Sequence, residues 1–255
     1  MSARQAALLV ALVTCLAATA APTVQQRQHT FARLPDWTGI WIADDGIMTR
    51  LGLRNDVEGD SGPTFKDLIL RKHPPYNTEW EARYQAARKV AGSPAAKECG
   101  FYFPGVMESP WPFEMLITPE ETAIIFAGRE VRHIYTDQRI HPSADDIWPT
   151  PWGDSVGRWE GQTLVAETIS VASKGPGAML LSPSARFVER IRRISRDKID
   201  DQLTVEDPVA LTHPWVMTIS YKRVTTIDRV IHSDCMENDR NPVVNGAVTI
   251  EPPKR

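Results

Sequence analysis

Alternation of apolar and polar residues is the clearest pattern in this chain. Trp215, Met217, Ile219 and Tyr221 fall on one face, and Thr218, Ser220 and Lys222 fall on the other. This period of two is typical of a strand with one buried face. Similar short runs, bounded by turn residues, recur along the chain. The predicted strands are 36–42, 113–118, 122–127, 130–136, 155–159, 163–171, 187–194, 198–205 and 215–224.

One segment has helical periodicity instead. Between residues 77 and 90, Trp80 and Tyr84 fall on the same helical face. We expect Thr78 to cap this helix and Glu81 to provide the carboxylate three residues later, as in a capping box. The sequence therefore predicts one helix that lies outside the series of strands.

Tight turns separate most of the predicted strands, and no alternation of strands with helices is visible. We therefore predict a mainly β fold, an antiparallel meander that hides its edges by closing into a lipocalin-like barrel, with one N-terminal helix outside it. The 20 prolines agree with this, because proline disfavours long helices. No linker divides the chain, so residues 36–255 are expected to form a single β-barrel domain.

The N-terminal region predicts export. Residues 1–20 contain Arg4, an uncharged apolar run and a small residue on each side of Thr19, which together are typical of a secretory signal peptide. We expect residues 21–35 to form a flexible lead and the mature protein to be periplasmic or secreted. No later stretch has the roughly 20 apolar residues of a membrane-spanning helix, so membrane insertion is not expected.

Two cysteines remain after the predicted cleavage. Cys99 and Cys235 are an even number in an exported chain, and we expect them to form a disulfide. The alternative is a metal site in which His232 joins Cys235, but Cys99 has no nearby cysteine or histidine to complete it.

Charge and motif content narrow the classes of function. The 29 basic and 32 acidic residues give a net charge of −3, which offers no electrostatic basis for binding nucleic acid. The sequence contains no phosphate loop and no dinucleotide fingerprint. We therefore expect no cofactor, no metal and no nucleic-acid partner.

Two carboxylates are the first candidates for catalysis. Glu167 shares a strand face with Val165 and Ile169, and Glu189 lies on an equally apolar face. If these faces point inward, burial raises the pKa of each carboxyl toward the range that acid–base catalysis uses. The alternatives are that the faces are solvated, or that Glu189 pairs with an arginine on a neighbouring strand.

A group of polar residues follows the predicted strand 130–136. Tyr135, Asp137, Arg139 and His141 are expected to lie near one another at its end. They are further candidates for moving protons, while the alternative is that Asp137 and Arg139 only shape a turn. A metal triad of His133, Asp137 and His141 would need a helix, and this segment has strand periodicity.

Residues 153–157 match the G-x-S-x-G pattern of a serine nucleophile, here Ser155. That motif requires a strand before the serine and a helix after it. A proline-rich segment precedes Ser155 and a predicted hairpin follows it. A serine hydrolase is therefore an alternative, but not the favoured function.

Aromatic residues gather in and around the loops between hairpins. Most are expected to pack in the core, but tryptophans in proline-rich loops at a barrel mouth also line pockets for flat or apolar ligands. The candidate substrate-binding residues are Trp111, Phe113, His133, Trp148, Trp152 and Trp159.

Longer motifs identify a resemblance. Residues 132–142 read RHIYTDQRIHP, and residues 153–165 read GDSVGRWEGQTLV. These motifs resemble a large family of exported bacterial proteins, and the resemblance spans about Trp37–Asn241. The chain departs from the family pattern at Gln138, where glycine is expected. The stretch Gly39–Trp41 is also similar to the G-x-W opening of lipocalins.

These expectations combine into one favoured hypothesis. The chain is expected to be an exported lyase, isomerase or dehydratase that acts without a cofactor on a hydrophobic or aromatic small molecule. The candidate catalytic residues are Tyr135, Asp137, Arg139, His141, Glu167 and Glu189. The alternative from another class is a carrier that binds such a molecule without chemistry.

Overall fold

The protein is described from a computed structural model of the 255-residue chain. The structure describes residues 22–44, 73–90, 102–108, 111–127, 130–173, 179–230, 243–244 and 247–248. The predicted signal peptide and both cysteines of the predicted disulfide, Cys99 and Cys235, lie outside the described residues. The chain forms two compact units, Met1–Arg33 and Leu34–Arg255.

The first unit contains a helix where the sequence analysis predicts a flexible lead. Helix α1 spans Val24–Phe31. The Thr23 hydroxyl accepts a hydrogen bond from the Gln26 N–H, and the Gln26 side chain accepts one from the Thr23 N–H, which together form a capping box. None of the helical residues is buried, so capping and local propensity favour this helix without an apolar face.

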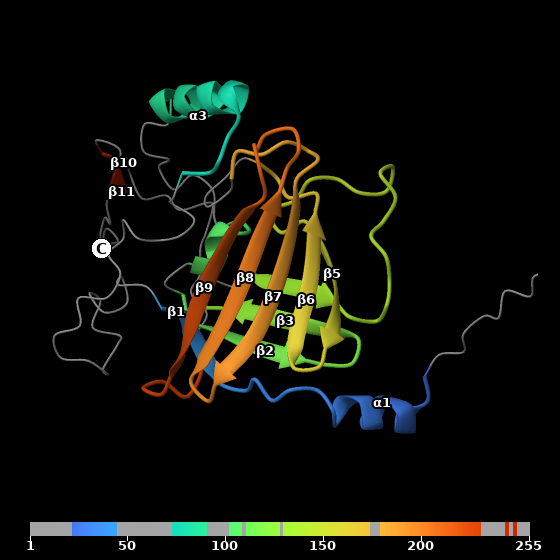
Figure 1. Ribbon diagram of the computed structural model, residues 1–255. Coiled ribbons are helices and arrows are strands. Elements are labelled where there is room, and N and C mark those ends of the chain that lie inside the picture. Colours follow the sequence, from blue (N-terminus) through green and yellow to red (C-terminus); the bar gives the residue numbers. More distant parts are fainter. Residues whose placement is uncertain are drawn as a thin grey trace, which may run out of the picture. The chain divides into compact units, whose positions relative to one another are not determined.

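The second unit is built on nine strands that form one sheet (Figure 1). Each strand pairs with the next in sequence, and β1 also pairs with β9, so the sheet closes into a ring. The strands are β1 (Ile40–Ala43), β2 (Phe113–Ile117), β3 (Glu121–Phe126), β4 (Val131–Tyr135), β5 (Asp154–Glu160), β6 (Thr163–Ile169), β7 (Arg186–Ser195), β8 (Lys198–Glu206) and β9 (Trp215–Val224).

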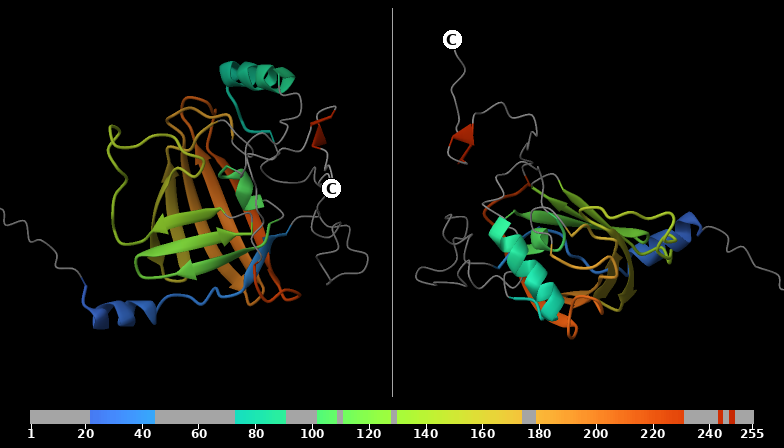
Figure 2. Two further views of the ribbon diagram at one scale, coloured as in Figure 1. Left: turned by 180° about the vertical axis from the view of Figure 1, so that it is seen from behind. Right: turned by 90° about the horizontal axis from the view of Figure 1, so that it is seen from above.

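The mainly β prediction is confirmed, and the predicted strands correspond to observed strands. The prediction of a wholly antiparallel meander is wrong at one junction, because β4 and β5 run parallel and share a single paired position, Tyr135 with Val156. The connection from residue 136 to 153 carries the chain back before β5 begins. Strands β2 to β4, in green, cross in front of the longer strands β5 to β9 when the molecule is seen from behind (Figure 2).

Alternation along the strands sets the inner face of the ring. On β8, Ile199, Asp201, Leu203 and Val205 are buried, whereas the residues between them are more exposed. The same period of two places apolar side chains from the other strands in one core. Large residues that are buried in this core include Trp41, Phe103, Phe113, Phe126, Phe187 and Tyr221.

A glycine is required where β5 begins. Gly153 has a φ of +66°, which side chains with a Cβ rarely adopt. A Cβ at this position would also lie 2.3 Å from the carbonyl oxygen of Ile169. The first glycine of the G-x-S-x-G pattern therefore allows β5 to approach β6 closely.

Helix α3 (Thr78–Val90) is the helix that the sequence predicts, but its cap differs. The Asn77 side chain accepts a hydrogen bond from the Trp80 N–H at 3.0 Å, so Asn77 and not Thr78 caps the helix. The Asn77 side-chain amide also donates to the Val209 carbonyl. Trp80 is buried in the core, so the segment that leads into α3 is fixed against the loop after β8.

Asp207 organises that loop. Its carboxylate accepts hydrogen bonds from the backbone and hydroxyl of Ser182 and from the N–H groups of Val209 and Ala210. This buried acid therefore has a structural role. Among the described residues, the remaining regular elements are the short helix η3 (Gly105–Glu108) and the paired strands β10 (Val243–Val244) and β11 (Ala247–Val248). Across the described ranges, no helix has both the length and the apolar character to cross a lipid bilayer.

Candidate functional site

A buried ion pair crosses the inside of the ring. Arg132 on β4 and Glu189 on β7 are 1% and 0% exposed, and they point toward each other from strands that are not neighbours. The Arg132 Nη1 donates to Glu189 Oε1 at 2.7 Å, and Nη2 donates to Oε2. The pair is therefore bidentate, which gives a fixed geometry to both side chains.

Arg132 has further partners on the inner face. Its Nη2 lies 3.0 Å from Thr168 Oγ1 and 3.4 Å from Ser155 Oγ, and these two hydroxyls lie 2.7 Å apart. The guanidinium carbon is 4.2 Å from the centre of the Phe103 ring, a cation–π contact. Burial is the largest single effect and would lower the pKa of Arg132. The charge and the hydrogen bonds of Glu189, with smaller effects of neighbouring groups, together outweigh burial, so the pKa is raised. Arg132 therefore stays positively charged inside the ring.

Asp201 is a second carboxyl beside this pair. Ile191 on β7 pairs with Asp201 on β8, and Leu203 on β8 pairs with Glu189, so the two acids are diagonal neighbours on the inner face. Asp201 is 0% exposed, and no N–H or O–H donor in the described part of the chain reaches either of its carboxyl oxygens.

The surroundings of Asp201 favour its neutral form. Burial raises the pKa of this carboxyl well above the usual value, and the negative charge of Glu189 raises it further, while Arg132 has a smaller opposing effect. Of the two acids, Glu189 has the bidentate partner and Asp201 does not. The proton therefore lies on Asp201, where a hydrogen bond to the neighbouring Glu189 carboxylate also favours it.

Tyr221 extends the group onto β9. Asp201 pairs with Ile219, so Tyr221 is its diagonal neighbour on the same inner face. The Tyr221 hydroxyl is buried and has no hydrogen-bond partner among the described residues. Burial raises the pKa of Tyr221 well above its usual value, and the negative charge of Glu189 adds to this effect, so the hydroxyl keeps its proton.

We call Arg132, Glu189, Asp201 and Tyr221 the interior cluster. The ion pair within it is neutral overall, and two protonated groups lie beside the pair. Strongly perturbed pKa values together with buried polar atoms that lack protein partners are characteristic of functional sites. The interior cluster is therefore the candidate functional site.

The structure separates the two predicted carboxylates. Glu189 lies inside the ring, where it pairs with an arginine from β4 and not from a neighbouring strand. Glu167 is 35% exposed and forms a 2.7 Å ion pair with Arg186, so the expectation that it is set in a dry interior is wrong. The reason is the strand period, because Leu164, Ala166 and Thr168 occupy the inner face of β6.

His141 lies with Glu167 on the outside of the ring. Its Nδ1 is 2.5 Å from Asp154 Oδ2, and its Nε2 is 3.7 Å from Glu167 Oε1, too far for a hydrogen bond. These contacts hold the connection between β4 and β5 against β5 and β6. His141 and Glu167 are therefore brought together, but away from Glu189.

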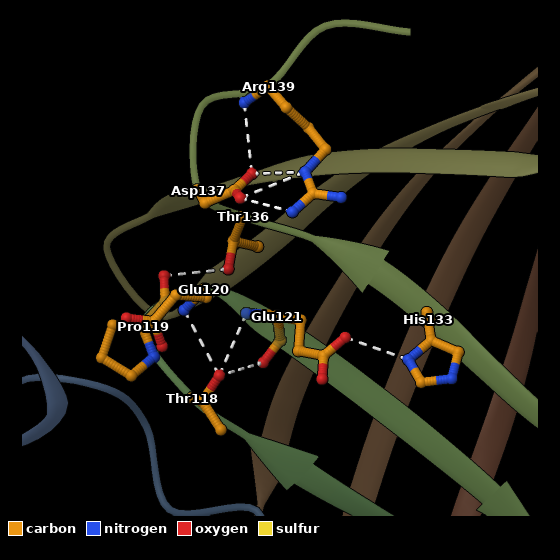
Figure 3. A network of polar contacts seen from close by, with 8 residues as sticks. All are labelled: Thr118, Pro119, Glu120, Glu121, His133, Thr136, Asp137 and Arg139. Carbon is orange, nitrogen blue, oxygen red and sulfur yellow. Dashed lines mark hydrogen bonds and ion pairs between the residues drawn. The ribbon is translucent and has the colours of Figure 1, made fainter. Parts of the chain in front are cut away.

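Tyr135, Asp137 and Arg139 form a second outer group. Arg139 makes two-pronged contacts with Asp137, the shortest at 2.6 Å, and its guanidinium lies 3.8 Å from the centre of the Tyr135 ring. The hydrogen bond from Arg139 lowers the pKa of Asp137. His133 instead pairs with Glu121 across β3 and β4, and it points away from Arg139 (Figure 3).

Three members of the cluster predicted at the end of β4 are in contact, and His141 is linked to them through Asp154, whose charge also acts on Arg139. Asp137 and Arg139 pair and shape the turn, which is the alternative that the sequence analysis left open. Gln138 between them has a φ of +69°, in the region that favours glycine. Among the described residues, no hydrogen bond or ion pair joins Tyr135, Asp137 or Arg139 to the interior cluster.

Ser155 lies in a different setting from a nucleophilic serine. It is buried within β5, its hydroxyl bonds to Thr168 and lies near Arg132, and β5 continues as a strand to Glu160. A nucleophile needs an adjacent base and an exposed position at the start of a helix. The geometry around Ser155 supplies neither of these, which disfavours the serine hydrolase alternative.

The predicted aromatic residues do not share one site. Phe113 lies inside the ring, with its ring centre 5.0 Å from that of Tyr221. Trp152 packs on Phe126, and Trp159 packs on Trp37. Trp148 is 71% exposed, and Trp111 is partly exposed.

Sequence reasoning missed three members of the interior cluster. The signal was present, because Asp201 alternates with Ile199 and Leu203, and Arg132 is followed two residues later by the apolar Ile134. A charged residue in phase with apolar residues marks an inner face. Tyr221 was placed on an apolar face by its alternation, but it was not considered as a polar group.

Metal binding has no support within the described ranges, which contain no group of three or more histidine, cysteine, aspartate or glutamate residues able to hold an ion. In particular, the segment with His133, Asp137 and His141 is not helical.

Comparison of the chain with models of protein families, with curated proteins and with solved structures found no match. The candidate function is therefore argued from the interior cluster alone.

Proposed function

We propose that the protein is an exported enzyme that carries out acid–base chemistry without a cofactor, as a lyase, isomerase or dehydratase, on a hydrophobic or aromatic small molecule. The reaction takes place inside the ring, which has the form of a lipocalin-like barrel. Asp201 and Tyr221 act directly on the substrate, and the Arg132–Glu189 pair stabilises the charge that develops.

The observation that carries this proposal is the setting of Asp201. A carboxyl whose pKa is raised well above its usual value can give its proton to a substrate oxygen as the bond between that oxygen and carbon breaks. The carboxylate that results can take the proton that the neighbouring carbon loses, so that the two transfers balance and Asp201 is protonated again. Between the two transfers Asp201 carries a negative charge, and the nearby charge of Arg132 favours that ionised form. Glu189 holds the arginine in place through its two hydrogen bonds.

Tyr221 provides a second donor on the same inner face. Its hydroxyl has no hydrogen-bond partner within the described residues, and its raised pKa keeps the proton in place. Donors that are fixed before the reaction stabilise negative charge on an oxygen at little reorganisation cost. A typical contribution of one such donor is about 10²–10³ in rate.

Binding without catalysis is the second candidate. It is favoured by the bidentate contact of Glu189 with Arg132, because both oxygens of that carboxylate already accept hydrogen bonds from the guanidinium. The aromatic side chains beside Tyr221, among them Phe113, would then hold an apolar ligand by packing. In this case Asp201 and Tyr221 would only orient the ligand.

The test is a screen of the purified protein against lignin-derived aromatics, steroids and terpenoids, with thermal stabilisation and product formation measured for each compound. Asp201→Asn removes the transferable proton and is expected to lower turnover by at least about 10². The matched control is Asp200→Asn on the same strand, because the Asp200 carboxylate bonds to Ser220 and Lys198 on the outer face.

The results separate the candidates. Turnover that Asp201→Asn abolishes and Asp200→Asn preserves supports the enzyme. Stabilisation by a compound without product, lost in Tyr221→Phe, supports the carrier and overturns the enzyme. Turnover that survives Asp201→Asn also overturns the proposed chemistry.

A further inference from the structure

The charges inside the ring limit which molecules can bind there. Arg132 is neutralised by Glu189 through two hydrogen bonds, and burial keeps Asp201 and Tyr221 protonated. The buried Glu108 also contributes negative charge that acts on Tyr221. The interior cluster therefore has no positive charge left to balance an anion.

A charged ligand would disturb this arrangement. An anion could reach the Arg132 Nε–H, which is buried without a partner among the described residues. It would also face the Glu189 carboxylate that already balances the guanidinium, in a region of low dielectric where like charges repel strongly. A cation would need Asp201 to lose its proton beside Glu189, which is the ionisation that both burial and Glu189 oppose. Neither sign of charge has a partner that is ready to receive it.

The polar atoms that lack protein partners suit an uncharged oxygen. The Tyr221 hydroxyl is a donor, and the protonated Asp201 carboxyl, whose proton can also be shared with Glu189, can donate or accept. The Thr122 hydroxyl on β3 is also buried without a partner among the described residues. Each of these groups can bond to a ketone, alcohol or phenol oxygen without a change of charge.

The remaining surface around Tyr221 is apolar. The Phe113 ring meets the Tyr221 ring edge to face at 5.0 Å, and it also contacts Phe126 at 5.3 Å between ring centres. Trp41 on β1 is fully buried in the same core. Aromatic side chains of this kind favour a flat hydrocarbon body.

We propose that the molecule bound by the interior cluster is an uncharged hydrophobic compound with a single oxygen function, a ketone, alcohol or phenol, whose oxygen bonds to Tyr221 and Asp201. This inference rests on the proposed interior site and specifies its substrate class. It excludes carboxylates and amines of the same shape.

The experiment compares four compounds with one naphthalene body. These are 2-acetylnaphthalene, which is a neutral ketone, 2-naphthoate, which is an anion, 2-(aminomethyl)naphthalene, which is a cation at neutral pH, and 2-ethylnaphthalene, which has no oxygen. Dissociation constants are measured by calorimetry at neutral pH for the wild type, Tyr221→Phe and the outer-face control Tyr135→Phe.

We expect the ketone to bind at least about tenfold more tightly than the anion or the cation, which corresponds to about 1.4 kcal/mol. Tyr221→Phe should weaken the ketone about tenfold and leave 2-ethylnaphthalene unchanged, while Tyr135→Phe should change neither. Anion or cation binding equal to that of the ketone overturns the substrate class but leaves the interior site in place.

A different result would remove the site itself. If the four compounds bind with affinities that Tyr221→Phe and Asp201→Asn do not alter, or if none binds, both the substrate class and the interior site are wrong. The same protein samples report all of these outcomes, so the two failures are distinguished directly.

Discussion

Two arginine–carboxylate pairs in this protein use the same chemical groups in opposite surroundings. Arg132 and Glu189 are enclosed by the ring, whereas the side chains of Arg139 and Asp137 are 48% and 29% exposed on its outer face. In both pairs the arginine makes short, bidentate hydrogen bonds to the carboxylate. The comparison teaches that enclosure by the ring, and not residue type, decides which pair shifts the pKa values of the groups around it. Arg132 and Glu189 lie on inward-facing strand positions, whereas Asp137 and Arg139 lie in the turn after β4.

The largest expected effect is the loss of one partner of the interior pair. Glu189→Ala leaves the Arg132 guanidinium buried without its counter-charge and should lower the free energy of unfolding by about 3–5 kcal/mol. Asp137→Ala removes a solvated partner and should cost at most about 1 kcal/mol. Urea unfolding of both variants measures the difference.

A double variant checks the cause of that loss. Arg132→Met combined with Glu189→Leu removes both charges and should be less destabilising than Glu189→Ala alone, because no buried charge remains unpaired. Equal losses for Glu189→Ala and Asp137→Ala would contradict the contrast between the two faces.

The next effect is a pH dependence of stability that comes from Asp201. The pKa of Asp201 in the folded protein is raised above the ordinary 3.8. At pH values between the pKa of the unfolded chain and that of the folded protein, the folded state therefore keeps a proton that the unfolded chain has released. The contribution of the Asp201 proton to the free energy of unfolding is therefore complete below the ordinary pKa. This contribution falls as pH rises between the two pKa values, by at most about 1.4 kcal/mol per pH unit.

Asp201→Asn should remove this contribution, because an amide cannot ionise. The difference in unfolding free energy between wild type and Asp201→Asn is measured at a series of pH values, with Asp200→Asn as the control that keeps the slope of the wild type. A difference that does not change with pH would show that Asp201 is not protonated in the folded state.

A smaller effect separates two buried tyrosine hydroxyls. Tyr76 donates to the Leu180 carbonyl at 2.9 Å, whereas Tyr221 has no partner in the described part of the chain. Tyr76→Phe should cost about 0.5–1.5 kcal/mol, and Tyr221→Phe should be neutral or slightly stabilising. Thermal unfolding of both variants measures this, and a larger loss for Tyr221→Phe would reveal a partner for its hydroxyl.

The smallest effect concerns the turn between Asp137 and Arg139. Gln138 has a φ of +69°, where glycine has no steric cost. Gln138→Gly should raise the unfolding free energy by about 0.5–1 kcal/mol, because the relief of the left-handed conformation exceeds the added freedom of the unfolded chain. A loss of stability would show that the Gln138 side chain makes a contribution of its own.

Much of the fold follows from the sequence because period-two alternation is a local signal. The run from Trp215 to Val224 predicts β9 residue for residue, and the helix near Trp80 is also found. The parallel contact between Tyr135 and Val156 was not predictable, because it depends on where a long connection returns to the sheet.

The site was predictable only in part, for a related reason. Glu189 and Glu167 both alternate with apolar residues, and the pattern alone does not tell which apolar face is enclosed. The partners of Glu189 come from β4 and β8, so no single motif contains the whole cluster, although Arg132 is the first residue of the motif at 132–142. The residues that form a recognisable motif, such as those from Tyr135 to His141, lie on the outer face instead.

The most direct test of this account is the ionisation of Asp201 itself. Carbon-13 NMR of protein labelled at the aspartate carboxyls, with the Asp201 signal identified by its loss in Asp201→Asn, reports its protonation as pH is varied. The account predicts a protonated carboxyl at neutral pH whose signal shifts when 2-acetylnaphthalene is added. A signal that titrates near the ordinary value of 3.8 and ignores the ketone would contradict it.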